Sequence, residues 1–217
     1  MNLNSRKFLP LVGLFCLVRA WYCFSMKKKR LGFDIVLLGQ IASGKDTQAN
    51  ILMGTYDLKP VESGKYWRTL AKSKSKEGDW LRRTTAKGLP APVALMKKFI
   101  VDNLARKPKN KDLIFIGNPR LKPEAQLLNK LFKSRREDYI AFYITLPNRE
   151  VKKRSLGRKR DALDEKYIKA RIKWHKEQVS KTVKYFDSLG KLSKINGNQT
   201  IPKIAKDIEQ VIKKHLS

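Results

Sequence analysis

Short apolar runs alternate with longer segments of helical periodicity from residue 33 to the end of the chain. The apolar runs cover residues 33–38, 113–116, 140–146 and 192–195. Such near-continuous runs are typical of strands that are buried on both faces of a parallel sheet. The segments between them favour helices at 47–53, 92–106, 123–132, 149–156, 165–189 and 201–215. This alternation predicts an α/β fold in which helices flank a central parallel sheet.

Two segments do not follow this alternation. Residues 65–87 are polar and basic with scattered large apolar side chains, which indicates a pair of short helices outside the sheet. The apolar stretch at 8–18 has 11 residues, fewer than the roughly 18 to 20 that a membrane span needs. It is followed by bulky residues where a signal-peptide cleavage site requires small ones. We interpret residues 1–25 as a non-native or dispensable extension, with a cleaved signal or an interfacial membrane anchor as alternatives, and residues 26–217 as one domain.

Composition predicts a folded protein that attracts anions. The 217 residues include 49 Lys and Arg against 19 acids, a net charge of +30, while the 41% apolar content excludes a disordered basic tail. Both cysteines, Cys16 and Cys23, lie in the extension, which fits a reducing compartment and predicts a cytoplasmic location. The two histidines, His175 and His215, are far apart in sequence, and we expect both to be exposed on helices rather than to form a metal site or a catalytic triad.

The strongest local motif follows the first predicted strand. Residues 39–45 read Gly-Gln-Ile-Ala-Ser-Gly-Lys and satisfy the P-loop pattern G-x-x-x-x-G-K before a predicted helix. Backbone N–H groups in such a turn and the helix N-terminus together form a phosphate cradle, which the lysine completes. The predicted ATP-binding residues are Gly39, Gln40, Ile41, Ala42, Ser43, Gly44, Lys45, Asp46 and Thr47. Thr47 is the predicted magnesium ligand, because Asp46 stands where the general pattern has Ser or Thr.

Five ordered segments resemble the adenylate kinase family of nucleoside monophosphate kinases. The P-loop lysine is followed by Asp-Thr-Gln, and the other four segments are Ser-Gly-Lys-Tyr-Trp-Arg at 63–68, Gly-Leu-Pro-Ala-Pro at 88–92, Gly-Asn-Pro-Arg at 117–120 and the arginines from 154 to 171. The resemblance covers residues 33–211 and implies a P-loop fold with a nucleoside monophosphate-binding insertion at 61–106 and a very short lid at 158–164. It also implies the reaction ATP + AMP ⇌ 2 ADP, with magnesium required.

The resemblance further implies a role for each matched residue. The acceptor nucleotide would contact Ser63, Arg68, Gly88, Pro92, Gly117, Arg120 and Glu124. Catalysis would use Lys45, Arg120, Arg158, Arg160 and Arg171, and Arg154 would pack on the donor adenine. Arginines suit this chemistry because each guanidinium is permanently charged and can bind two phosphate oxygens at once.

Several positions depart from the family pattern. Ile116 stands where an aspartate usually helps to hold magnesium, and Lys65 replaces the acid of the acceptor motif. Glu124 stands where a glutamine usually reads the acceptor adenine, so the acceptor base is left open. The usual acid pair of the lid falls at Ala162 and Leu163, with Asp161 and Asp164 beside them. These changes remove acids and leave open whether turnover is reduced.

A second hypothesis comes from the large positive charge. A catalytically weak, P-loop-derived protein that binds nucleotides or nucleic acid would use basic patches, with Tyr66, Trp67, Trp80 and Trp174 stacking on bases. Such aromatic residues more often pack in a core, and the sequence contains no continuous basic stripe on a recognisable nucleic-acid module. A kinase for a non-nucleotide alcohol is disfavoured by Arg68 and the turn at 88–92. We therefore favour a monomeric nucleotide kinase over a nucleic-acid-binding protein.

Overall fold

Five parallel strands form the centre of the computed structural model, which describes residues 28–85, 91–157 and 165–217. The strands are β1 (Asp34–Gly39), β2 (Leu58–Val61), β3 (Asp112–Ile116), β4 (Tyr139–Thr145) and β5 (Leu192–Asn196). They are hydrogen-bonded in the order β2-β3-β1-β4-β5. The predicted α/β fold with a central parallel sheet is confirmed. The N-terminal extension, Gly88 and the predicted lid with Arg158 and Arg160 lie outside the described residues.

Helices cover both faces of the sheet because the central strand buries side chains on both faces. Ile35 and Leu37 of β1 pack on the side of α2 (Lys45–Thr55) and α10 (Ile201–Leu216). Val36 and Leu38 belong to the opposite layer, with α5 (Val93–Ala105), α6 (Lys122–Arg135) and α9 (Ser180–Ser188). All four strand residues are completely or almost completely buried. The two apolar layers explain why the strand is a continuous hydrophobic run.

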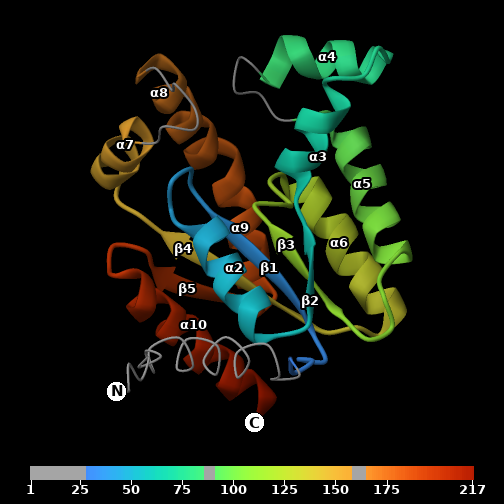
Figure 1. The fold of residues 1–217 in the computed structure, drawn as a ribbon, viewed down its shortest axis with the longest axis vertical. Helices are drawn as coiled ribbons and strands as arrows, with labels where there is room; N and C mark the ends of the chain where they lie inside the picture. Colours follow the sequence, from blue (N-terminus) through green and yellow to red (C-terminus); the bar gives the residue numbers. More distant parts are fainter. Residues whose placement is uncertain (1–27, 86–90, 158–164) are drawn as a thin grey trace, which may run out of the picture.

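Two pairs of helices stand on either side of the carboxyl end of β1. Figure 1 shows α3 (Ser63–Leu70) and α4 (Lys76–Thr85) on one side, and α7 (Asn148–Leu156) and α8 (Glu165–Trp174) on the other. The first pair confirms the two short helices expected outside the sheet. The predicted helix at 165–189 is α8 continued by a π-helical turn, η1 (His175–Val179), and by α9. No described helix has the length and hydropathy that a bilayer span requires.

The edge strand β2 was absent from the sequence-based prediction. Its four residues are Leu-Lys-Pro-Val, so a charge and a proline interrupt the apolar pattern. A proline is tolerated here because β2 pairs only with β3, and an edge strand can do without one N–H donor. Leu58 and Val61 are buried against the sheet. Because α3 follows β2 directly, this pairing determines where the segment between β2 and β3 begins.

Two buried aspartates accept hydrogen bonds at the amino ends of the central strands. The carboxylate of Asp34, at the start of β1, accepts hydrogen bonds from the backbone N–H of Leu113 (2.6 Å) and from Lys107 Nζ (2.8 Å). Asp112, at the start of β3, accepts bonds from the N–H groups of Leu31 and Gly32, both 2.9 Å long. Both aspartates are fully buried. They fix how the chain enters the two central strands.

Candidate active site

The turn after β1 has the tight backbone of a phosphate loop. Gly44, at the N-terminus of α2, has a φ of 88°, a left-handed conformation that glycine adopts at no steric cost. A Cβ atom on Gly39 would lie 2.5 Å from Ser43 Oγ and 3.0 Å from the carbonyl oxygen of Ile144. Only glycine fits at that position. The Lys45 ammonium group donates to the carbonyl oxygen of Gln40 at 3.3 Å, so it folds back over the turn.

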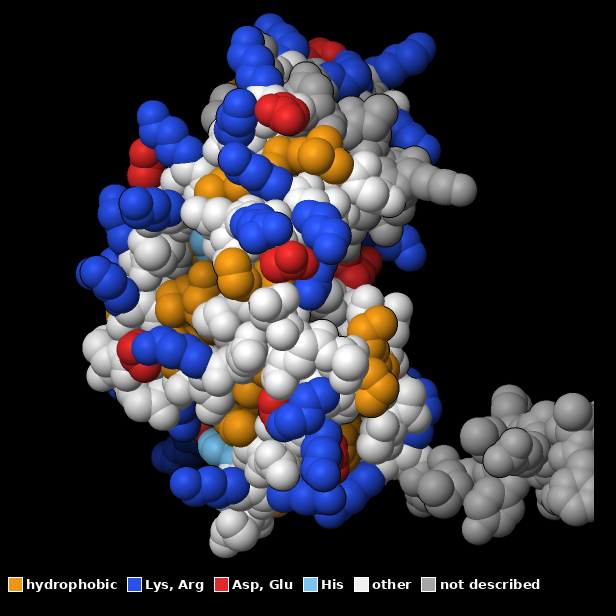
Figure 2. All heavy atoms as spheres, turned by 90° about the vertical axis from the view of Figure 1, so that its left-hand side faces the viewer, with side chains coloured by type: hydrophobic (Ala, Val, Ile, Leu, Met, Phe, Trp, Pro, Cys, Tyr) orange, Lys and Arg blue, Asp and Glu red, His pale blue; other side chains and the backbone are white. Residues whose placement is uncertain are grey.

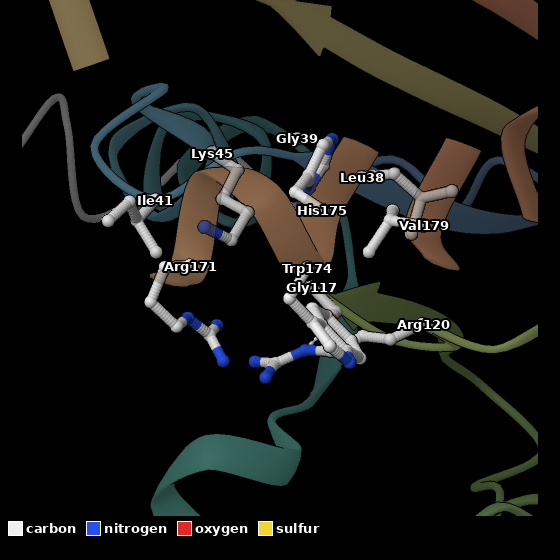
Figure 3. Close-up of a pocket in the computed structure, with 10 residues that line it drawn as sticks. All are labelled: Leu38, Gly39, Ile41, Lys45, Gly117, Arg120, Arg171, Trp174, His175 and Val179. Atoms are coloured by element: carbon white, nitrogen blue, oxygen red, sulfur yellow. Dashed lines mark hydrogen bonds between the residues drawn. The ribbon is translucent and has the colours of Figure 1, made fainter. Parts of the chain in front are cut away.

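A small hollow adjoins this turn. It brings together Lys45 from α2, Arg120 from the loop after β3, and Arg171 from α8. Figure 3 shows the guanidinium groups of Arg120 and Arg171 pointing toward each other across its mouth. The complete lining is Leu38, Gly39, Ile41, Lys45, Gly117, Arg120, Arg171, Trp174, His175 and Val179. Three of the predicted catalytic cations thus share one hollow; we call it the cation cavity.

Arg120 is held by hydrogen bonds on three sides. Its Nε donates to the carbonyl oxygen of Gly117 at 2.8 Å, its backbone N–H donates to Glu124 Oε2 at 2.8 Å, and its carbonyl oxygen accepts from Thr182 Oγ1 at 2.8 Å. Burial lowers the pKa of the Arg120 guanidinium to about 10, and the charge of Arg171 adds to this effect. Arg120 still carries its charge at neutral pH. A rigid, charged guanidinium is a preorganised group for binding an anion.

Arg171 also lies in a partly dehydrated position. Burial lowers the pKa of its guanidinium. Its Cζ atom lies 5.5 Å from the ring centroid of Trp174, within cation–π range. The indole packs against the hydrophobic core, so it connects the charged cavity to the apolar layer beneath it.

The expectation that both histidines are exposed is wrong. His175 is 8% exposed and lines the cation cavity, because it lies four residues after Arg171 and so shares its helix face. Its Nε2 lies 3.0 Å from the hydroxyl of Tyr143. Burial lowers the pKa of His175 to about 4, helped by the charges of Lys45, Arg171 and Arg120. His215 is also partnered: its Nε2 lies 2.7 Å from Asp138 Oδ2, and its ring packs edge-on against Phe33.

A second hollow is lined by other residues of the phosphate loop. Its lining is Ala42, Ser43, Gly44, Thr47, Gln48, Arg154, Gln199, Thr200, Ile201 and Ile204. Arg154 is among the residues that line this hollow, and its contact with a donor base stays a prediction. Its Nη1 donates to the carbonyl oxygen of Gly197 at 3.2 Å. We call this hollow the Arg154 cavity.

The sequence reasoning missed the part of the Arg154 cavity formed by residues 199–201. These residues lie just after β5 and at the start of α10. The Gln48 side chain ties this segment to the phosphate loop, because its Nε2 donates to the carbonyl oxygen of Ile201 at 3.1 Å. A signal was present: ligands bind outside the carboxyl ends of parallel strands, and residues 199–201 follow such an end.

The remaining acceptor residues do not line either cavity. Ser63 is buried at the start of α3, Arg68 is exposed on the same helix, and Pro92 precedes α5. Their contacts with a nucleotide stay predictions.

Glu124 has a local structural role. One carboxylate oxygen accepts hydrogen bonds from the backbone N–H groups of Arg120 and Leu121, at 2.8 and 3.1 Å. Burial raises the pKa of Glu124, and these N–H groups oppose the rise. The carboxylate serves as the N-terminal cap of α6 because Leu121, at the capping position, has no acceptor in its side chain. Contact between Glu124 and a base stays a prediction.

The described residues contain no cluster of three or more His, Cys, Asp or Glu side chains that could hold a metal. The Ile116 side chain belongs to the core layer shared with α2, so nothing replaces the expected acid there. Near the phosphate loop, Thr47 lines the Arg154 cavity, and Asp46 lies close enough to raise the pKa of Arg120. These two side chains carry a hydroxyl and a carboxylate, oxygen groups of the kind that Mg²⁺ binds together with phosphates and water.

The Lys and Arg side chains on the face that Figure 2 presents gather at its upper and lower ends, and mostly uncharged and apolar surface lies between them. Of the aromatic residues considered for base stacking, Trp67 is buried, Trp80 and Trp174 are partly buried against the core, and Tyr66 is 47% exposed. The three tryptophans therefore follow the more common pattern of packing in a core.

Comparison with known proteins agrees with this geometry. The profile of the family described as adenylate kinase matches residues 37–191. The chain is similar to the adenylate kinase of Azobacteroides pseudotrichonymphae, with 28% identity over 186 residues, 82% of this chain and 96% of that protein. It is 27% identical to the adenylate kinase of Bacteroides fragilis over 180 residues, 81% of this chain and 95% of the relative. The adenylate kinase of Methanothrix thermoacetophila is 24% identical over 212 residues, covering 83% and 99% of the two chains.

Proposed function

The chain belongs to the adenylate kinase family, and from this premise we propose how its two cavities divide the work of the reaction ATP + AMP ⇌ 2 ADP. The Arg154 cavity takes the base and ribose of the donor ATP, and the cation cavity takes the phosphates that react. The phosphate loop lies between the two hollows and contributes residues to both. The observation that carries this proposal is the convergence of Lys45, Arg120 and Arg171 on one cavity beside that loop.

The donor is held by the loop and the helix behind it. Backbone N–H groups of residues 39–44 and the positive end of α2 bind the phosphate chain, because partial positive charge gathers at a helix N-terminus. Lys45 bridges the β- and γ-phosphates, and its ammonium group stays in contact with the γ-phosphoryl group during transfer. Arg154 packs on one side of the adenine, where its bond to Gly197 holds the guanidinium in place.

Transfer itself requires positioning and charge more than covalent chemistry. Arg120 binds the acceptor phosphate, and Arg171 stabilises the negative charge on the transferring γ-phosphoryl group. Guanidinium groups suit this step because they were oriented before substrate arrived, so little reorganisation is needed in the transition state. Arg158 and Arg160 add to this set from the lid and exclude water that would otherwise accept the phosphoryl group.

The acceptor nucleotide lies on the side of α3. The matched residues Ser63, Arg68, Gly88, Pro92, Gly117 and Glu124 are proposed to hold it, and AMP is the acceptor. Magnesium would be held by Thr47 and Asp46 through water and would neutralise charge on the β- and γ-phosphates of ATP. The location of both cysteines in residues 1–25 supports a reducing compartment, the cytoplasm, as the place of action.

A coupled assay of ADP formation tests the proposal. Purified protein is given ATP, Mg²⁺ and each of AMP, UMP, CMP, GMP and their deoxy forms. We expect AMP to be used best and Lys45→Ala to lower kcat/KM by about 10²- to 10³-fold. The matched control is Lys213→Ala, an exposed lysine on α10, which should leave the rate unchanged. Absence of any acceptor-dependent activity that requires Lys45, together with steeply salt-dependent binding to random nucleic acid, would instead support the catalytically weak binding protein.

A further inference from the structure

A buried imidazole in the cation cavity has no part in the mechanism described above. His175 lines the cavity that holds Lys45, Arg120 and Arg171. It lies where the helix changes from α8 to the π-helical turn η1, and single π-helical turns within helices occur frequently at functional sites. Behind it, Tyr143 of β4 lies with its ring 14° from parallel to the imidazole and its hydroxyl 3.0 Å from Nε2.

The charges that act on His175 in the described structure are all positive. They come from Lys45 on α2, from Arg120 after β3, and from Arg171 one turn earlier on its own helix. The fourth neighbour, Tyr143, is neutral, because burial raises the pKa of its phenol. Burial and these three cations keep the imidazole unprotonated, with a pKa of about 4. The nucleotide-free cavity therefore has a neutral ring among three fixed cations.

Phosphate groups reverse this balance. Each terminal phosphate brings a charge of about −1.5 to −2 at neutral pH, and the ATP and AMP phosphates enter the same small cavity. An anion close to an imidazole favours its protonated form, as strongly as nearby cations disfavour it. A protonated imidazole also has both ring nitrogens as donors, so one can face Tyr143 while the other is available to a phosphate oxygen.

We propose that His175 takes up one proton from solvent when the nucleotide phosphates enter the cation cavity and then acts as a fourth cationic group that binds them. The proposal rests on the proposed function, since it places both phosphate groups beside Lys45, Arg120 and Arg171. No covalent bond changes: solvent supplies the proton on binding and regains it on release. Nucleotide affinity then increases as pH falls, by at most about tenfold per pH unit between the two pKa values of the ring.

Histidine NMR tests this directly, because the chain has only two histidines. The ring carbon–proton signals are followed against pH in the free protein and with AMP plus an ATP analogue whose β- and γ-phosphates are joined by a non-hydrolysable imido bridge. His215→Asn assigns the signals, and His215 then reports any general change in the protein. We expect the pKa of His175 to rise by roughly two to three units with both ligands bound, because a smaller rise from about 4 would leave the ring neutral at pH 6.

Calorimetry with the same ligands counts the protons. Binding is measured at pH 6 in two buffers of different ionisation enthalpy, for wild type, His175→Gln and His215→Asn. Wild type and His215→Asn should take up more protons than His175→Gln. The NMR titration uses the wild-type chain, so it remains decisive even if His175→Gln does not fold. Ligand binding with an unchanged His175 pKa overturns this proposal and leaves the proposed function standing, whereas absence of binding overturns both.

Discussion

A methyl group added at Gly117 would collide with the side chain of Lys45. The Cβ atom of an alanine there would lie 2.9 Å from Lys45 Cε, whereas carbon atoms normally approach to about 3.5–4.0 Å. Lys45 must therefore move by about 1 Å, and its end is flexible enough to do so. We predict that Gly117→Ala displaces the lysine from the cation cavity with a modest loss of stability.

The expected magnitudes follow from the geometry. Gly117 has a φ of +67°, and an L-residue in this left-handed region costs about 1–2 kcal/mol. Misplacing a catalytic group by about 1 Å can cost about 100-fold in rate. Gly190 is a matched control, because its φ is +66° and a Cβ atom there has nothing within 4 Å. Gly190→Ala should lose similar stability and keep full activity.

Two measurements separate the effects. Urea unfolding gives the free energy of unfolding of both variants, and the coupled ADP assay gives kcat/KM. We expect equal losses of stability in the two variants and a kcat/KM about 100-fold lower for Gly117→Ala alone. If both variants turn over AMP within about threefold of each other, contact between position 117 and Lys45 does not position the lysine for catalysis.

Three further predictions concern other parts of the molecule. Arg154→Ala should raise the KM for ATP about tenfold, equivalent to ~1.4 kcal/mol, with little change in the KM for AMP; equal changes for both nucleotides in steady-state kinetics would argue against a donor-base contact. Between pH 6.5 and 4 the unfolded chain protonates His175 while the folded chain does not, so stability should fall by about 3 kcal/mol as pH falls through this window. Urea titrations should show a flatter pH dependence for His175→Gln, and identical curves would contradict the low pKa. Asp34→Asn should cost about 3 kcal/mol, because Lys107, 8% exposed, loses its closest charge partner; a loss below about 1 kcal/mol in chemical denaturation would show that Glu137, at 3.5 Å, suffices.

Local patterns were sufficient to predict the elements around the phosphate loop. The apolar run of β1, the two glycines and Lys45 are contiguous, so their geometry depends on near neighbours in the chain. The strand β2 was missed for the opposite reason: Pro60 is acceptable only because the strand lies at an edge, and edge position is a property of the assembled sheet.

In the site, too, sequence motifs identified some residues, whereas the environment of others depends on tertiary packing. Arg120 and Arg171 could be selected as phosphate-binding candidates from matched motifs, but His175, four residues from Arg171, was interpreted as exposed. Helical periodicity indicates that two residues share a face, and it does not indicate what that face meets. The environment of His175 depends on Lys45 and Tyr143, which come from α2 and β4.

The amino-acid sequence by itself determined the class of fold and the phosphate loop, because periodicity and glycine placement are carried by residues close together in the chain, and its resemblance to a family selected the cations around that loop. Only the tertiary structure decided that three of those cations share one cavity and enclose a neutral imidazole. It also decided that Glu124 caps a helix. The reason is that side-chain ionisation and hydrogen bonding respond to distances of a few ångströms, and those distances are set by how separate strands and helices pack.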